Sequence, residues 1–252
     1  MTFNAATAIL SALAQEQHGL IELLERPSKI THAGRDFWQG VLHGQNVVLA
    51  LSKIGKVAAA TTTTALIERF GVRRIVFTGV AGGLGAGINV GDVVVGQSFV
   101  QHDLDSSPLF PRYEVPLYGK TRFDGDTDLT ALLYAATRAA LANPQLCQAY
   151  PAAKAHLGLV ASGDRFVSGS GESSALRAAL MLAGHDVLAV EMEGAAAAQV
   201  CHDYGVPFAA VRTISDRADD SAHVDFPGFV DQVASKYAQI IVERFLCMLQ
   251  NK

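Results

Sequence analysis

Three acidic residues stand where predicted β-strands end. Each of Glu16, Glu193 and Asp216 follows an apolar run that is rich in strand-forming residues, and Arg212 lies within the last of these runs. Ligands of α/β sheets bind beyond the carboxyl ends of the strands, so we expect these side chains to gather there. Carboxyl groups in such a place can donate and accept protons. The pattern therefore predicts a catalytic site.

Each acidic residue also has a purely structural interpretation. Glu16 and Glu193 stand at the start of predicted helices, where a negative charge is favourable, and Asp216 is of a type that begins turns. For one residue alone the structural interpretation is as good as the functional one. Glu193 and Asp216 together, with Arg212 on the same strand as Asp216, favour a site.

The elements that position these residues alternate along the chain. The sequence predicts strands at 7–13, 47–51, 74–78, 92–100, 156–162, 187–190 and 208–214, a hairpin segment at 36–44, and helices ending near 24, at 55–70, 129–142, 173–183, ending near 204, and at 229–249. Strands that alternate with helices indicate an α/β fold. The chain has no repeat and no low-complexity linker, so we expect one domain over 1–252.

Two further segments suggest ligand contacts. The sequence from Gly79 to Gly91 is GVAGGLGAGINVG, and glycine at this density lets the backbone approach a ligand closely. It follows a predicted buried strand, which favours a ligand loop over a flexible surface loop. The segment from Gln101 to Phe123 is long and irregular and contains aromatic side chains, which predicts a lid or a subunit contact.

Composition narrows the classes of function. The 252-residue chain has a net charge of −4 and no basic stripe, which argues against nucleic acid or a membrane as its main partner. Its three cysteines form no CxxC motif and suggest a reducing compartment, and the first basic residue is Arg26, which argues against a secretory signal. We therefore expect a cytoplasmic protein. No acidic or histidine cluster has metal-site spacing, and we expect no metal.

Four segments in order resemble one known family. They are similar to segments of the 5′-methylthioadenosine/S-adenosylhomocysteine nucleosidases of the nucleoside phosphorylase superfamily. In chain order they are SKIGKVAAA at 52–60, TGVAGGLGAGINVGDVVV at 78–95, SGDRFVSG at 162–169, and VEMEGAAAAQVC with VPFAAVRTISDRAD at 190–219. The resemblance covers most of the chain except about 101–125. It implies a three-layer α/β/α domain around a central mixed sheet, a homodimer, no cofactor, and hydrolysis of the bond between adenine and a 5′-thio-substituted ribose.

The resemblance also implies a role for each site residue. Asp216 would protonate adenine at N7 and Ser215 would orient it, while Glu16 and Arg212 would act on the attacking water. Glu193 would bind the ribose hydroxyls and Met192 would pack against the sugar. Phe166 would stack on adenine and the backbone of Val167 would read its edge. The matching segments add Glu191, Val80, Gly82 and Ile54 as substrate-binding positions.

One departure from the family pattern bears on the water. Relatives often have a serine where this chain has Val80, and an isopropyl group cannot hold water. A purine nucleoside phosphorylase that uses phosphate is one alternative, although Glu16 and Val80 offer phosphate no donor. A nucleoside-binding protein without turnover is another, since a fold alone does not establish catalysis. The unusual length of 101–125 leaves the preferred 5′-substituent open among methylthioadenosine, S-adenosylhomocysteine, 5′-deoxyadenosine and aminodeoxyfutalosine.

Overall fold

The computed structural model describes residues 6–219 and 228–250. Within them the chain forms one ten-stranded sheet. Its strands are β1 (Thr7–Ser11), β2 (Glu25–His32), β3 (Arg35–Leu42), β4 (Gln45–Leu51), β5 (Arg74–Gly83), β6 (Val93–Gln101), β7 (Arg122–Asp124), β8 (Ala155–Ser162), β9 (Val187–Glu191) and β10 (Phe208–Asp216). The α-helices are α1 (His18–Glu22), α2 (Lys56–Glu68), α3 (Thr127–Leu141), α4 (Pro144–Ala149), α5 (Ser170–Leu182), α6 (Gly194–Tyr204) and α8 (Ser235–Gln250), with a 3₁₀ turn at Ala14–Glu16 and a π-helical turn at Val230–Ala234.

The sheet is mixed, and part of it closes on itself. The strand order is β10-β6-β8-β9-β5-β1-β4-β3-β2, and β10 also pairs with β5, so that five strands form a ring. Strands β4, β1, β5 and β10 run parallel to one another in the middle of the sheet, and their other neighbours β3, β9 and β6 run antiparallel to them. Every residue of β10 is buried, as expected of a central strand that is covered on both faces. Closure brings the carboxyl ends of β5, β9 and β10 together.

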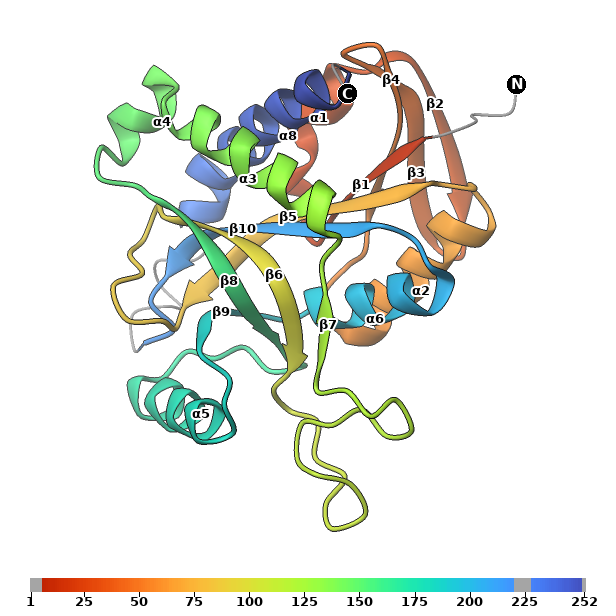
Figure 1. The fold of residues 1–252 in the computed structure, drawn as a ribbon. Helices are drawn as coiled ribbons and strands as arrows, with labels where there is room; N and C mark the ends of the chain where they lie inside the picture. The colour runs from red at the N-terminus through yellow and green to blue at the C-terminus, as the bar shows by residue number, and fades with distance from the viewer. Residues whose placement is uncertain (1–5, 220–227, 251–252) are drawn as a thin grey trace.

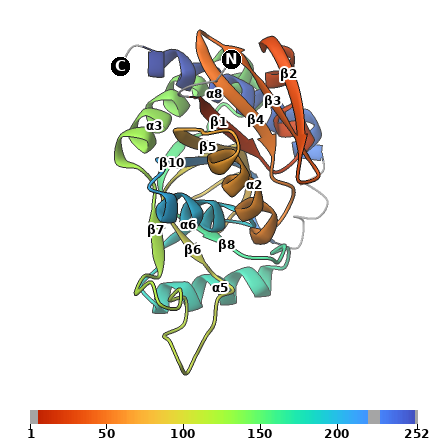
Figure 2. The same cartoon turned by 90° about the vertical axis from the view of Figure 1, so that its right-hand side faces the viewer.

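Helices cover both faces of the sheet (Figures 1 and 2). On one face, α2 and α6 pack their alanine and leucine side chains against β1, β4 and β5. On the other face, α1, α3 and α8 contribute residues such as Leu20, Leu133 and Phe245 to a second apolar cluster. Helix α5 lies apart from both layers and buries Leu180 against β8 and β9. This confirms the three-layer α/β/α architecture with a central mixed sheet.

Most predicted elements exist, with informative differences. The first residues of the glycine-rich segment belong to β5, and Asp216 is the last residue of β10 rather than part of the following loop. The sequence analysis missed β2, because almost all of its side chains are exposed and it has no apolar alternation. It also missed the short α4. Helix α6 ends at Tyr204, where the sequence predicts a helix end, and Gly205 follows in the left-handed conformation (φ 63°). Residues 1–5, 220–227 and 251–252 of the predicted domain lie outside the described residues.

The predicted helix at 229–249 corresponds to α8 and the turn before it, and it packs one apolar face into the second apolar cluster. Tyr237, Ile241 and Phe245 are buried, while Val233 and Ile240 pack against the same cluster. None of the helices in the described ranges has the length and hydropathy that a bilayer crossing requires.

Candidate active site

One cavity collects every residue that the sequence analysis placed in a site. It has a volume of about 350 Å³, within the roughly 300–1,000 Å³ of small-molecule pockets. It opens where β1, β5, β9 and β10 end. The predicted residues that line it are Glu16, Ile54, Val80, Gly82, Phe166, Val167, Glu191, Met192, Glu193, Arg212, Ser215 and Asp216.

Glycines in β5 let the neighbouring strand place its polar side chains. In the parallel pairing of β5 with β10, Gly79 lies opposite Arg212 and Gly82 opposite Asp216. A Cβ on Gly82 would lie 3.0 Å from Asp216 Oδ1, and one on Gly79 would lie 3.2 Å from Glu16 Oε1. A side chain at either position would crowd a carboxyl group. The close approach predicted from the glycine density is therefore an approach of β5 to its own site residues.

Asp216 is held by its nearest neighbours in the chain. Its side chain is buried, the Ser215 hydroxyl donates to Oδ2 at 2.8 Å, and the Ala218 N–H donates to Oδ1 at 2.8 Å. A register shift between Ile214 and Asp216 interrupts the regular pairing of β10 at this point. The shift is a bulge, which turns a side chain away from the regular strand alternation. Asp216 thus has a fixed orientation at the wall of the cavity.

Glu16 is anchored by main-chain groups. Only 2% of the residue is exposed, and its carboxyl group accepts hydrogen bonds from the N–H groups of Ala12 (2.9 Å), Leu13 (3.0 Å) and Val80 (3.2 Å). Burial raises the pKa of Glu16, although these donors and Arg212 act in the opposite direction. A buried carboxyl group with a raised pKa suits a group that exchanges protons.

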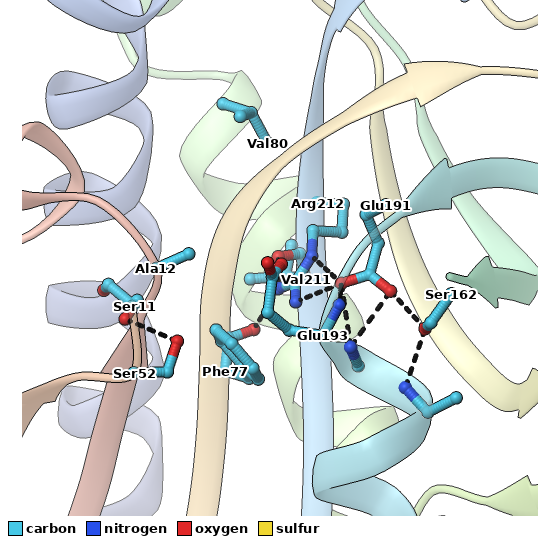
Figure 3. A network of polar contacts seen from close by, with 12 residues as sticks. Ser11, Ala12, Ser52, Phe77, Val80, Ser162, Glu191, Glu193, Val211 and Arg212 are labelled. Atoms are coloured by element: carbon cyan, nitrogen blue, oxygen red, sulfur yellow. Dashed lines mark hydrogen bonds and ion pairs between the residues drawn. The ribbon is translucent and has the colours of Figure 1, made fainter. Parts of the chain in front are cut away.

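Arg212 and Glu191 form a buried ion pair beneath the cavity (Figure 3). Arg212 donates from Nη2 to Glu191 Oε2 at 2.8 Å and from Nε at 3.2 Å, and its Nη1 donates to the Phe77 carbonyl at 3.1 Å. Its guanidinium carbon lies 4.2 Å from the centre of the Phe77 ring. Both side chains of the pair are only 2% exposed. Arg212 is therefore fixed in place before any ligand arrives.

Both carboxyl oxygens of Glu191 accept hydrogen bonds from other groups of the protein. Besides Arg212, it accepts hydrogen bonds from the Ser162 hydroxyl and from the N–H groups of Glu193 (3.1 Å) and Gly194 (2.9 Å). Glu191 lines the cavity as predicted, but these partners make it a group that positions Arg212 and the start of α6. Ser162 extends the support by accepting from the Ala195 N–H at 2.7 Å.

Glu193 has a partner on another element. It precedes α6 without capping it through its side chain, and its Oε1 accepts a hydrogen bond from the Gly55 N–H at 2.9 Å. Burial and the nearby Glu191 carboxylate raise the pKa of Glu193 to about 8, against the opposing influence of Arg212. Because the carboxyl group accepts hydrogen bonds in either protonation state, it can bind hydroxyl groups across this range.

The raised pKa predicts a pH-dependent stability. The folded chain retains the Glu193 proton between pH 4.5 and about 8, whereas the unfolded chain loses it, so the free energy of unfolding falls as pH rises through this window. Replacing Glu193→Gln removes this loss, on the order of a few kcal/mol. Urea unfolding at pH 5 and pH 8 measures it. Glu25→Gln, at an exposed carboxyl group, is the control and keeps the wild-type slope. An unchanged slope in Glu193→Gln would contradict the assignment.

The rest of the wall is apolar except for Arg165. Val167 is buried, whereas Ile54 and Phe166 are 56% and 42% exposed. These two side chains, with Met192 and Val80, complete the cavity between the polar floor and solvent. A flat apolar ring beside carboxyl groups is suited to a ligand that is planar at one end and polar at the other.

Lys56, Asp103 and Asp164 form a set of polar contacts between two walls of the cavity, which we call the polar clasp. Lys56 Nζ pairs with Asp103 Oδ1 at 2.5 Å, Asp103 Oδ2 accepts from the Asp164 N–H at 2.8 Å, and Asp164 Oδ1 accepts from the Lys56 N–H at 2.7 Å. The clasp joins the segment that carries Ile54 to the segment that carries Phe166. The distance between these apolar walls therefore depends on it.

The sequence analysis missed several supporting residues. Ser162 and Asp164 stand in the SGDRF segment, and Lys56 stands in SKIGK, so their signal was their place in segments already singled out. Phe77 was read only as part of an apolar strand. Their contacts cross between distant parts of the chain, and spacing alone does not reveal such contacts.

Comparison with known proteins shows the family to which the chain belongs. The sequence profile described as "Phosphorylase superfamily" matches residues 6–246. The chain is 36% identical to the 5′-methylthioadenosine/S-adenosylhomocysteine nucleosidase of Bacillus thuringiensis (strain Al Hakam), over 94% of this chain and 96% of the relative.

Two solved structures share the fold closely. The 5′-methylthioadenosine/S-adenosylhomocysteine nucleosidase from Neisseria meningitidis, in complex with methylthio-immucillin-A, superposes with a TM-score of 0.85 at 35% identity, covering 96% of this chain and 98% of that chain. The futalosine hydrolase of Helicobacter pylori superposes with a TM-score of 0.84 at 31% identity, covering 98% of both chains. The chain belongs to the phosphorylase superfamily and, within it, to the family of the 5′-methylthioadenosine/S-adenosylhomocysteine nucleosidases.

Proposed function

We propose that this enzyme hydrolyses the N-glycosidic bond of 5′-thio-substituted adenosines and releases adenine. One observation carries the proposal: Glu16, Glu193 and Asp216, from three separate parts of the chain, line one cavity together with Phe166. Glycoside hydrolysis commonly uses carboxyl groups on opposite sides of the bond that breaks, one as acid and one to activate water. The membership of the chain in a nucleosidase family supports adenine as the leaving base.

The contacts of each carboxyl group support a separate role. Asp216, oriented by Ser215 and the Ala218 N–H, donates a proton to N7 of adenine, which leaves as a neutral base. Glu193 accepts hydrogen bonds from the ribose hydroxyls, and these contacts hold the sugar in place. Glu16, with its raised pKa, accepts the proton of the attacking water. The positive charge of Arg212 favours the ionised forms of Glu16 and Glu193.

The substrate-facing roles follow from the apolar wall. Phe166 stacks on adenine while the backbone of Val167 contacts the edge of the base. Met192 packs against the sugar, and Ile54 borders the 5′-substituent. The Val80 N–H donates a hydrogen bond to Glu16, but the Val80 side chain has no hydroxyl group to bind the attacking water. On this side of the cavity, Glu16 is therefore the group that binds the water.

Water suits this cavity better than phosphate. Glu16 must be ionised to accept a proton from water, and its carboxylate would repel a phosphate anion, while the guanidinium of Arg212 is already bonded to Glu191 and to main-chain carbonyls. Hydrolysis is therefore preferred to phosphorolysis. The fixed, buried carboxyl groups also exceed what a nucleoside-binding protein needs.

The test is adenine release from 5′-methylthioadenosine. The purified protein is incubated with this nucleoside in phosphate-free buffer and again with phosphate, and adenine and the sugar product are quantified by chromatography. We expect full turnover without phosphate and a free reducing sugar in both buffers. Turnover that requires phosphate and yields a sugar 1-phosphate would establish a phosphorylase instead. Binding without turnover in either buffer would establish a nucleoside-binding protein.

The 5′-substituent calls for a panel of substrates. Residues 102–121 have no helix and only an isolated bridge between Val115 and Lys120, so they form a long connection after β6. Relatives include nucleosidases for methylthioadenosine and a futalosine hydrolase. Values of kcat/KM for methylthioadenosine, S-adenosylhomocysteine, 5′-deoxyadenosine and aminodeoxyfutalosine will rank the substituents.

The polar clasp predicts an effect on substrate binding. Replacing Lys56→Met removes the Lys56–Asp103 ion pair and loosens the walls that carry Ile54 and Phe166. Since a partly exposed pair contributes up to ~1 kcal/mol, we expect KM to rise up to about five-fold with little change in kcat. The matched control is Lys29→Met, which breaks the exposed Lys29–Asp36 pair on β2 and β3. Equal kinetics in both variants would contradict this role of the clasp.

We further propose a cytoplasmic homodimer built from one nucleosidase domain per chain. The exposed apolar side chains Ile54 and Phe166 at the cavity, and Leu109 and Leu117 on the long connection, support a subunit contact because such surface favours burial. The exposed thiol of Cys247 suits a reducing compartment. Sedimentation velocity at micromolar concentration tests the dimer, and a monomer would contradict it.

A further inference from the structure

A second cavity adjoins the proposed active site. It has a volume of about 410 Å³, also within the roughly 300–1,000 Å³ of small-molecule pockets. It lies between α5 and residues 83–86 at the end of β5, and Arg217, the residue after β10, also lines it. The two cavities share walls: Gly82 and Asp216 line the first, and the next residues, Gly83 and Arg217, line the second.

The second cavity has an unbalanced positive charge. Arg177 from α5 and Arg217 both line it, beside the hydroxyl groups of Ser173 and Ser174, and no acidic residue is among the described residues of its lining. The acid next to Ser173 on α5, Glu172, is paired with Arg165 at 2.7 Å. Two arginine residues therefore line this cavity with no acidic residue among its described lining, in a chain whose net charge is −4.

Arg177 also has an unsatisfied donor. Its Nε is buried and has no hydrogen-bond partner within the described part of the chain. A buried donor of a charged group without an acceptor is costly, because it has lost water and gained nothing. An anionic ligand in the cavity would supply the missing negative charge beside this guanidinium group.

We propose that this cavity binds the phosphate group of a small phosphate ester. Planar guanidinium groups match the oxygens of phosphate with paired hydrogen bonds, and serine hydroxyls add neutral donors. Arg177 and Arg217 hold the phosphate, assisted by Ser173 and Ser174, and the remaining volume receives the organic part of the ester. These four side chains lie outside the lining of the proposed active site, so the inference stands independently of the proposed function.

Calorimetric titration without nucleoside tests the proposal. The probes are ribose 5-phosphate, inorganic phosphate and, as the uncharged comparison, ribose. We expect ribose 5-phosphate to bind with one site per chain, inorganic phosphate to bind the same site, and ribose not to bind. Arg177→Gln and Arg217→Gln each weaken ribose 5-phosphate binding about ten-fold or more, the scale of losing one charge-assisted contact. The control Arg244→Gln, at an exposed arginine of α8, leaves the affinity unchanged.

Two results would overturn the proposal. The first is undetectable binding of both phosphate probes to the wild-type protein. The second is unchanged affinity in the double variant Arg177→Gln/Arg217→Gln, which would place the anion elsewhere. Ser173→Ala, with its smaller change, provides a second variant should the arginine variants melt early, and it is expected to weaken binding several-fold. None of these readouts uses turnover, so failure here is distinguishable from failure of the proposed nucleosidase activity.

Discussion

Replacing Asp216→Asn is expected to lower kcat for adenine release by two or more orders of magnitude, the typical contribution of a general acid. The amide can still donate a hydrogen bond to N7, and Ser215 and Ala218 still hold the side chain, but the amide cannot transfer its proton. KM should therefore change little while kcat collapses. Initial rates over a range of methylthioadenosine concentrations separate the two parameters.

Asp186→Asn is the matched control for this experiment. It makes the same chemical change at an exposed position just before β9 and is expected to leave both parameters at wild-type values. A near-normal kcat in Asp216→Asn would show that the proton reaches adenine from another group. The general acid would then not be the last residue of β10.

The second large effect is on stability. Arg212→Met leaves the Glu191 carboxylate buried without its ion-pair partner, and breaking one side of a buried pair costs about 3–5 kcal/mol. For a chain of this size we expect Tm to fall by roughly 10 °C. The methionine fills much of the space of the arginine side chain, so the loss reflects charge more than volume. Thermal unfolding followed by circular dichroism measures it.

A double variant distinguishes the cause. Arg212→Met with Glu191→Gln removes the orphaned charge, so we expect the pair of changes to restore much of the lost stability. An Arg212→Met variant as stable as the wild type would contradict the structural role of the ion pair. A double variant no more stable than Arg212→Met would show that the loss arises from packing against Phe77 instead.

Much of the fold follows from local pattern. The apolar runs that became β1, β9 and β10 are buried on both faces, and such strands have a clear signature. The exposed edge strand β2 has no such signature, because solvent tolerates any polar side chain there. The pairing of β10 with both β5 and β6, which closes part of the sheet, depends on the twist of the whole sheet and has no local signal.

The residues of the site could be predicted from the sequence, whereas the hydrogen bonds and ion pairs among them could not. Glu16, Glu193 and Asp216 were visible as acids at strand ends, and the family resemblance supplied their roles. That Glu191 is committed to Arg212 was not visible, because its partners come from strands far apart in the sequence. The raised pKa of Glu193 likewise arises from burial and from Glu191, which only the assembled cavity brings together.

A crystal structure of the Asp216→Asn variant with 5′-methylthioadenosine would show whether the three carboxyl groups surround one sugar, since the slow variant preserves the substrate. We expect N7 of adenine within hydrogen-bond distance of residue 216, the two ribose hydroxyls hydrogen-bonded to Glu193, and a water between Glu16 and C1′ of the sugar. Adenine bound at Glu193, or a sugar whose C1′ faces away from Glu16, would contradict it.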